Sequence, residues 1–222
     1  YYWNGSQVRE FEDPMNGWDV LPQGVNDDGV IVGNLFDPEA RKTYAFLYRV
    51  ETDTIARLPV ASASYAYDVN KHGVIVGGYS SAYFGHNVGR WIPIPPDNDT
   101  LGPDNLAWAD YIFDEIEDSG VATALNDSGV VVGYHDSYVD QASTLLAFVW
   151  DPQTDVLLEL ETPNAHAELN RRLREMGYSP IHLSASASVA LDINNCGDVV
   201  GWIDAIKAVL WRDGAVIDLN TV

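Results

Sequence analysis

Short apolar segments that end in glycine recur along the chain, each directly after an Asn-x-x-Gly turn. The four copies read GVNDDGVIVGNL from Gly24, DVNKHGVIVGGY from Asp68, ALNDSGVVVGYH from Ala124 and DINNCGDVVGWI from Asp192. Runs such as VIVG and VVVG are rich in β-branched residues, too short for helices and bounded by glycine, which favours buried strands. Asparagine can bond the backbone two residues on, and glycine tolerates positive φ. Each copy therefore predicts a turn that leads into a buried strand.

A second kind of segment alternates with the first: an aromatic residue closes a short apolar run, a turn follows, and an alternating stretch comes next. The copies are YYWNGSQVREF (1–11), YAFLYRVETDTIARL (44–58), VGRWIPIP (88–95), LLAFVWDPQTDVLLEL (145–160) and KAVLWRDGAVIDL (207–219). Their anchor aromatics are Trp3, Tyr48, Trp91, Trp150 and Trp211. The loops carry the Gly, Asn, Asp and Pro of tight hairpins. We expect the first, fourth and fifth anchors to be buried between neighbouring sheets.

Each pair of hairpins makes a four-stranded antiparallel sheet, and sheets that repeat at roughly 45 residues indicate a propeller or a β-solenoid. The predicted fold is therefore an all-β propeller that spans residues 1–222 as one domain. Five aromatic hairpins favour five blades, and four Asn-Gly hairpins leave four blades as the alternative.

The spacing of the repeated asparagines locates two insertions. Asn26, Asn70, Asn126 and Asn194 are separated by 44, 56 and 68 residues. The extra residues lie at about 93–120 and 161–185. The second insertion predicts a short helix, because it has an N-cap, an apolar face and two helix-ending residues. Those features are Asn164, then Leu169, Leu173 and Met176, then Gly177 and Pro180.

The repeated pattern [Asp/Ala]-[Ile/Val/Leu]-Asn-x-x-Gly-x-Val-Val-Gly-[Tyr/Trp], followed by Ala-Phe-[Leu/Val]-[Trp/Tyr], resembles the HAF repeat of bacterial extracellular proteins. The copies that match best are ALNDSGVVVGYH…LLAFVW and DINNCGDVVGWI…KAVLW, although the histidine that often precedes Ala-Phe is Tyr44 and Leu146 here. The resemblance covers nearly the whole chain outside the two insertions. It implies a secreted or surface β-propeller-like domain, and it implies no general catalytic motif.

The net charge of the chain limits the classes of partner that it can bind. Lys and Arg number 12 against 33 Asp and Glu, which gives a net charge of −21 that repels nucleic acid and anionic lipid. Solubility explains such a charge, and cation binding is the alternative. Cys196 is the one cysteine, so no intrachain disulfide is expected. No apolar run approaches the roughly 18 residues of a membrane span. We expect an extracellular or cell-surface protein whose signal peptide is absent from this chain.

Standard catalytic signatures are missing, which weakens simple hydrolase, zinc and nucleotide interpretations without excluding glycosidases or lyases. One acidic segment, DNDTLGPDN, suggests a cation site. Its carboxylates Asp97, Asp99 and Asp104 are candidate Ca²⁺ ligands next to Gly102. The twelfth position of an EF-hand would be Trp108 here, so the segment is not an EF-hand. A solvated acidic loop is the alternative, as it is for residues 110–120.

Polar and aromatic residues also follow the repeated Val-Gly, where equivalent strand ends of a propeller point to one face. Aromatic rings stack on the C–H faces of sugars and carboxylates accept hydroxyl protons, so this series predicts a carbohydrate site. Its members are Tyr79, Tyr134, His135, Asp136, Trp202 and Asp204. The alternative is that they are turn and packing residues.

The sequence has few basic side chains that could bind an anionic ligand. Arg171, Arg172 and Arg174 cluster in the second insertion, where they either dock onto the acidic body or bind a sulfated or uronic glycan. The five histidines lack metal-ligand spacing.

The sequence thus favours a non-enzymatic extracellular binding module for a glycan or a cell-surface protein. The alternatives are a propeller enzyme that acts on polysaccharide, either a glycosidase or a lyase, and a structural surface or filament protein.

Overall fold

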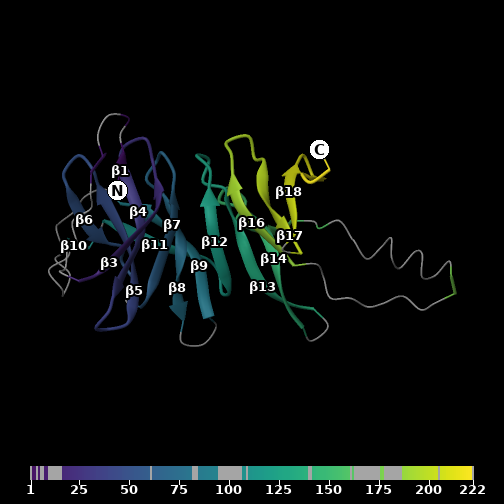
Figure 1. The fold of residues 1–222 in the computed structure, drawn as a ribbon, viewed down its shortest axis with the longest axis horizontal. Coiled ribbons are helices and arrows are strands. Elements are labelled where there is room, and N and C mark those ends of the chain that lie inside the picture. The colour runs from purple at the N-terminus through teal and green to yellow at the C-terminus, as the bar shows by residue number, and fades with distance from the viewer. Residues whose placement is uncertain are drawn as a thin grey trace. The chain divides into compact units, whose positions relative to one another are not determined.

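The computed structural model contains β-strands and turns, and no helix occurs among the residues it describes (Figure 1). These residues are 2–3, 5, 8–9, 17–60, 62–81, 85–94, 107–108, 110–139, 142–160, 162, 176–177, 187–204 and 206–221. The prediction of an all-β fold is confirmed. The acids Asp97, Asp99 and Asp104 lie outside the described residues. So does the helix predicted in the second insertion, apart from Met176 and Gly177, which form a turn. Within them, no helix is long and apolar enough to cross a membrane.

The chain contains two compact units, Tyr1–Ile116 and Glu117–Val222, which we call unit 1 and unit 2. The single domain expected over residues 1–222 stays a prediction. Unit 1 contains the hairpin β1 (Tyr2–Trp3) and β2 (Val8–Arg9) and two larger sheets. Unit 2 contains two four-stranded sheets. We number the larger sheets 1 to 4 in chain order.

Sheet 1 has the strand order β10-β6-β5-β4-β3. Its strands are β3 (Asp19–Val25), β4 (Val30–Asp37), β5 (Lys42–Arg49), β6 (Thr54–Arg57) and β10 (Ala107–Trp108). Sheet 2 has the order β11-β9-β8-β7. Its strands are β7 (Ser64–Val69), β8 (Ile75–Ser81), β9 (Gly85–Pro93) and β11 (Tyr111–Glu117).

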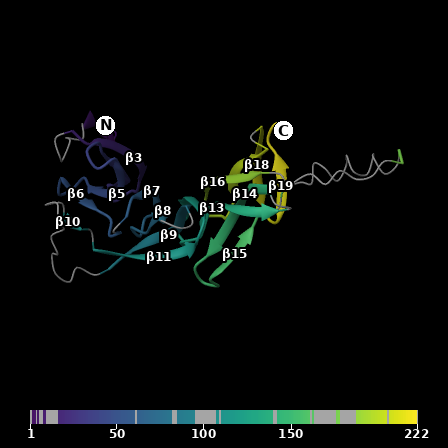
Figure 2. The ribbon, with the colours of Figure 1, turned by 90° about the horizontal axis from the view of Figure 1, so that it is seen from below.

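Unit 2 repeats the same plan, with β13 and β14 as its longest hairpin (Figure 2). Sheet 3 consists of β12 (Gly120–Leu125), β13 (Val131–Val139), β14 (Ala142–Asp151) and β15 (Val156–Glu159). Sheet 4 consists of β16 (Ser188–Ile193), β17 (Val199–Ile203), β18 (Lys207–Arg212) and β19 (Ala215–Asp218). Neighbouring strands of both sheets pair antiparallel in chain order.

The first predicted insertion contributes strands to the sheets. β10 pairs in parallel with β6, and β11 completes sheet 2. The acidic stretch 110–120, expected as a loop, therefore contains a strand over Tyr111–Glu117. The physical reason lies in its side chains, because Tyr111 is buried in the core of unit 1 and Phe113 packs against that core.

The repeated Val-Gly has a steric cause. The register shifts once in the first strand of every sheet, for example between Ala122 and Ala124 in β12. Opposite each shift the two backbones come so close that a side chain does not fit. A Cβ on Gly133 would lie 2.0 Å from the carbonyl oxygen of Val121. The equivalent glycines Gly33, Gly77 and Gly201 show separations of 2.2, 1.9 and 2.0 Å.

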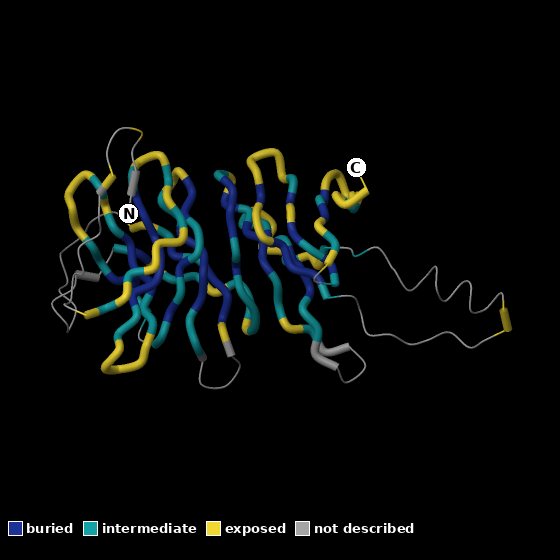
Figure 3. Tube along the Cα trace, in the orientation of Figure 1, coloured by how far each residue is buried: buried dark blue, intermediate teal, exposed yellow. Residues whose placement is uncertain are grey.

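Each unit has its own core between its two sheets, and Figure 3 shows the buried residues in the middle of the strands. In unit 1, Val32 and Leu47 of sheet 1 pack with Trp91 of sheet 2. In unit 2, Val132 of sheet 3 packs with Trp211 of sheet 4. The predicted burial of the anchors is confirmed for Trp150 and Trp211, whereas the side chain of Trp3 lies outside the described residues.

Candidate ligand-binding site

The repeated asparagines hold their own turns together. The Asn126 Oδ1 accepts hydrogen bonds from the backbone N–H groups of Ser128 (3.0 Å) and Val130 (3.1 Å). Asn26, Asn70 and Asn194 accept the same two bonds in their turns. Their side-chain oxygens satisfy backbone donors, so these residues are part of the scaffold of any site nearby.

The asparagine amides also join one sheet to the next inside each unit. The Asn26 Nδ2 donates to the Asn70 carbonyl oxygen at 3.0 Å, and Asn126 donates to the Asn194 carbonyl oxygen at 3.3 Å. In unit 2 a second hydrogen bond joins the two Asn turns, because the Asn195 Nδ2 donates to Asp127 Oδ2 at 2.7 Å. The Asn turns of neighbouring sheets are therefore brought to one end of each unit.

At this end of unit 1 lies a pocket of about 310 Å³. It is lined by the Asn turns of sheets 1 and 2, by the hairpin between β5 and β6, and by the start of β11. The lining residues are Asn26, Asp28, Val30, Arg49, Glu51, Thr52, Lys71, His72, Gly73, Pro93 and Tyr111. The volume is at the small end of the range for ligand pockets, roughly 300–1,000 Å³. It brings Arg49, Lys71 and His72 together in a chain that has only 12 Lys and Arg.

The Tyr111 phenol forms the buried wall of this pocket. Burial raises the pKa of Tyr111 above its ordinary value, while the positive charge of Arg49 and a hydrogen bond from its guanidinium act in the opposite direction. The net pKa is raised, so the phenol is protonated at neutral pH. Tyr111 can then donate its hydroxyl proton to a ligand while its oxygen accepts from Arg49.

A comparison with sheet 4 shows why Arg49 faces the pocket. Arg212 occupies the equivalent position and binds Asp198 of its own Asn turn with its Nε (2.7 Å) and its second guanidinium nitrogen (2.6 Å). In sheet 1 the residue equivalent to Asp198 is Val30, which pairs with Arg49 in the strand register. Since valine has no carboxylate, the Arg49 guanidinium is available to Tyr111 and to the pocket.

One feature of the sequence points to this site, although the similarity of the four repeats makes it easy to overlook. The residues inside the four Asn turns are Asp-Asp, Lys-His, Asp-Ser and Asn-Cys. Only the turn of sheet 2 supplies basic side chains, Lys71 and His72. Tyr111 and Arg49 had no such signal, because they reach the pocket from a strand inside a predicted insertion and from the end of β5.

The residues predicted to form a carbohydrate site lie on three different sheets. Tyr79 belongs to β8, where its hydroxyl donates to Glu115 Oε2 at 2.9 Å and its ring contacts Phe113 edge-on at 5.3 Å. Trp202 lies on β17, and Asp204 follows that strand with a φ of 53°. Gly201 and Ile203, on either side of Trp202, are buried. Because side chains alternate along a strand, Trp202 faces away from sheet 3.

On β13 the structure brings two of the predicted residues together. Tyr134 and Asp136 share one face of the strand, and burial together with the Asp136 charge raises the pKa of Tyr134. Asp136 Oδ2 accepts a hydrogen bond from Ser119 at 3.0 Å. His135 points to the other face, where its Nε2 lies 3.4 Å from Glu159 Oε1. These contacts are consistent with the alternative that Tyr134, His135 and Asp136 are packing residues. The sugar contacts expected of them stay a prediction.

Within the part of the chain that the structure describes, no three His, Cys, Asp or Glu residues form a group suited to a metal ion. The predicted Ca²⁺ ligands are not among these residues, so the calcium site stays a prediction.

The fold and the pocket define an all-β repeat protein with a small polar pocket at the Asn-turn end of unit 1. Residues 60–213 match the family described as "Protein of unknown function (DUF3466)", and the chain belongs to that family. No curated protein and no solved structure matches it significantly.

Proposed function

We propose that this chain is a non-enzymatic binding module whose ligand is an acidic saccharide, held in the pocket of unit 1. The observation that carries the proposal is the convergence of Arg49, Lys71 and the protonated Tyr111 phenol in one cavity of a strongly acidic chain. Guanidinium groups bind carboxylates and sulfates with charge-assisted hydrogen bonds. Asp28 and Glu51, on the same pocket, suit sugar hydroxyl groups because carboxylates accept their protons.

The raised pKa of Tyr111 favours binding over catalysis. A tyrosine that acts as a general base must lose its proton near the working pH. Burial instead holds the phenol protonated, with Arg49 only partly offsetting this effect. A protonated phenol is a good hydrogen-bond donor to a carboxylate or a ring hydroxyl.

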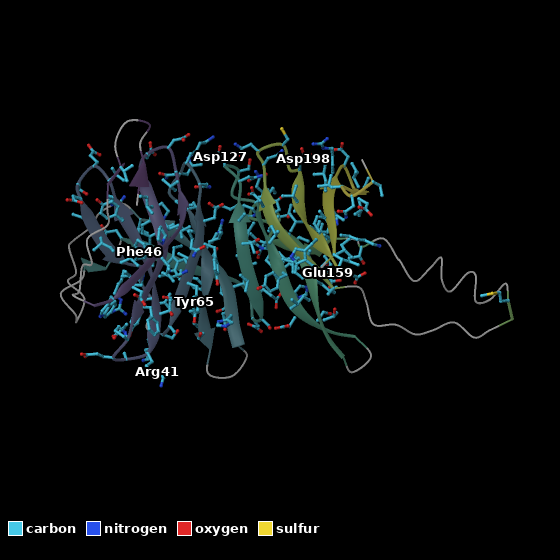
Figure 4. All side chains as sticks on the ribbon, viewed as in Figure 1. Arg41, Phe46, Tyr65, Asp127, Glu159 and Asp198 are labelled. Atoms are coloured by element: carbon cyan, nitrogen blue, oxygen red, sulfur yellow. The ribbon has the colours of Figure 1, made fainter. Side chains whose placement is uncertain are left out.

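Calorimetric titration with a uronic-acid oligosaccharide tests the proposal. The wild-type chain should bind it and should not bind a neutral oligosaccharide of the same length. Arg49→Gln should weaken binding by about 10- to 100-fold, the value of one charge-assisted hydrogen bond. Arg41→Gln is the matched control, because Arg41 lies in the hairpin at the opposite end of β4 and makes the same change of charge (Figure 4).

Two results would contradict the proposal. One is a wild-type chain that binds no acidic oligosaccharide. The other is an Arg49→Gln variant that binds as tightly as the Arg41→Gln control.

One observation favours a lyase as the second candidate. Tyr111, His72 and Arg49 line the same pocket, and a proton-transferring pair beside a cation that neutralises a uronate carboxylate is a suitable set for β-elimination. A lyase would release unsaturated products that absorb in the ultraviolet. We expect no such absorbance when the oligosaccharide is incubated with the wild-type chain.

The arrangement of the four sheets in the whole fold is a second part of the proposal. We infer that the sheets are blades stacked as in a β-propeller, supported by the four repeated hairpin pairs and by the stacking of two sheets in each unit. The five-blade count rests on the aromatic hairpin of residues 1–11, which contains the two-stranded sheet β1–β2. The resemblance to HAF repeats supports this arrangement and an extracellular location.

A further inference from the structure

The pocket of unit 1 has two walls of opposite charge. Sheet 1 contributes the carboxylates of Asp28 and Glu51, and sheet 2 contributes Lys71 and the phenol of Tyr111. Arg49 comes from sheet 1, but its guanidinium donates a hydrogen bond to the Tyr111 oxygen. Its charge therefore lies at the wall of sheet 2. We call Asp28 and Glu51 the acidic wall, and Arg49, Lys71 and Tyr111 the basic wall.

The strand register builds the acidic wall. Just beyond the last pair of residues in the β4–β5 ladder, the Val50 N–H donates to the Gly29 carbonyl oxygen at 3.0 Å. The next residues along the two segments are Asp28 and Glu51, and both line the pocket. Two carboxylates on neighbouring positions repel each other. A positive group that enters the pocket is therefore stabilised at this wall.

The Asn turn of sheet 2 builds the basic wall. Its glycine, Gly73, has a φ of 75°, and a Cβ there would lie 3.4 Å from the Tyr111 hydroxyl oxygen. The hydroxyl group therefore lies against the turn that carries Lys71. A carboxylate at this wall can accept hydrogen bonds from Tyr111 and Arg49, and the ammonium group of Lys71 attracts it.

The two walls belong to turns that are bonded to each other. The Asn26 Nδ2 donates to the Asn70 carbonyl oxygen at 3.0 Å, which joins the Asn turns of sheets 1 and 2. Asp28 and His72 occupy the same position in these turns, because each donates its backbone N–H to the side-chain oxygen of its asparagine. Equivalent positions of two bonded turns thus carry an acidic side chain on one wall and a basic side chain on the other.

The opposed charges are not a requirement of the repeat. At the positions equivalent to the acids and cations of the two walls, unit 2 has Ser128, Asp151, Gln153 and Asn195. Only Asp151 is charged, and the side chain of Asn195 is hydrogen-bonded to Asp127 of the facing turn. The same backbone is therefore built without opposed charges in unit 2, which indicates that in unit 1 they serve the ligand.

We propose that the pocket selects an acidic saccharide that also carries a free amino group, with the ligand carboxylate on the basic wall and its ammonium group on the acidic wall. This inference rests on the proposed function and narrows its ligand to a zwitterionic saccharide. A ligand without the amine brings negative charge toward Asp28 and Glu51. Its hydroxyl groups can bond to these carboxylates, but they leave both charges unbalanced. Complementary charges across a binding site determine which ligand is selected.

Calorimetric titration with two tetrasaccharides of the same backbone tests the inference. One alternates glucuronic acid with N-acetylglucosamine. The other is its N-deacetylated form, whose amines are protonated at about pH 6 while its carboxylates are ionised. The wild-type chain should bind both, and it should bind the deacetylated form about 10-fold more tightly, because an ammonium group forms charge-assisted hydrogen bonds with carboxylates.

Variants of the acidic wall identify the cause of this preference. Asp28→Asn and Glu51→Gln should each reduce it, and the double variant should bind both forms equally. The double variant should still bind the acetylated form at least as tightly as the wild type does, which shows that its pocket is intact. Glu39→Gln is the matched control, because Glu39 is exposed in the hairpin between β4 and β5, at the end of sheet 1 away from the pocket. This variant should keep the preference.

The control is necessary because the deacetylated form has less negative charge, so a chain of charge −21 attracts it without any specific contact. A double variant that keeps the same preference as Glu39→Gln would overturn the inference. Equal affinity of the wild-type chain for both forms would overturn it too, and the proposed function would stand. A wild-type chain that binds neither form would overturn the proposed function and the inference together.

Discussion

At the scale of single residues, the repeated asparagine explains why four turns of different composition have one shape. The inner pairs differ in every turn, yet each asparagine accepts two backbone N–H groups with its side-chain oxygen. The amide then reaches the next turn in the same unit, as from Asn126 to the Asn194 carbonyl oxygen. The inner positions are left to vary, and in sheet 2 they supply Lys71 and His72 to the pocket.

Asn126→Ala should lower the free energy of unfolding by about 1–3 kcal/mol, because two backbone donors lose their acceptor. Asn126→Asp keeps the acceptor oxygen and should cost less. Urea denaturation measures both variants, and uronate affinity should be the same in each. Unchanged stability together with a collapse of affinity would mean that Asn126 is a ligand-binding residue.

Asp198 should titrate far below an ordinary aspartate. Hydrogen bonds from Arg212, which has the larger effect, and from Asn194 lower its pKa to about 2. Since the pKa is lower in the folded protein than in the unfolded chain, the contribution of this pair to stability is present above the ordinary aspartate range. It is lost as the pH falls toward 2. Carboxyl NMR should show the low pKa, and Arg212→Gln should raise it, whereas Arg41→Gln should leave it unchanged.

At the scale of strands and sheets, the close approach at the repeated glycines and the burial of the anchor tryptophans define the repeat. The register shift in each first strand brings its carbonyl against the glycine of the second strand, as Val121 does against Gly133. The anchor at the end of the third strand then fills the core, as Trp211 does between sheets 3 and 4.

Trp150→Ala should destabilise the chain by roughly 3–5 kcal/mol, the usual cost of removing a buried aromatic side chain. Trp202→Ala is the matched control, because Trp202 is only half-buried and lies on the face of sheet 4 that points away from sheet 3. Thermal or urea unfolding compares the two. An equal loss of stability in both variants would contradict the role of Trp150 as a core anchor.

At the scale of the whole chain, the sequence pattern predicted the all-β class and the repeated hairpins because both depend on local alternation and turn chemistry. It did not predict strand β11, since the acids in residues 110–117 resemble a loop until Tyr111 and Phe113 are seen to face the core. Nor did it predict the pocket, because Arg49, Lys71 and Tyr111 come from three separate segments that only the packing of sheets 1 and 2 brings together.

The acidic composition makes stability dependent on ions. General screening should raise the melting temperature in NaCl, because the chain carries a charge of −21. The predicted Ca²⁺ site would add a specific effect of about 2.7 kcal/mol at a 100-fold excess over the dissociation constant. Melting should then rise more in CaCl₂ than in NaCl of equal ionic strength, and the Asp97→Ala, Asp99→Ala variant should lose that difference. Equal shifts in both salts would indicate a solvated acidic loop.

The central claim is that the ligand occupies the pocket of unit 1, while the repeat supplies the scaffold. Amide NMR spectra of the ¹⁵N-labelled chain, recorded during titration with a uronic-acid oligosaccharide, test it most directly. The largest shifts should appear at Arg49, Lys71, His72 and Gly73, which line the pocket. Shifts confined to Tyr134, His135, Asp136 and Trp202, or no shifts at all, would contradict the claim.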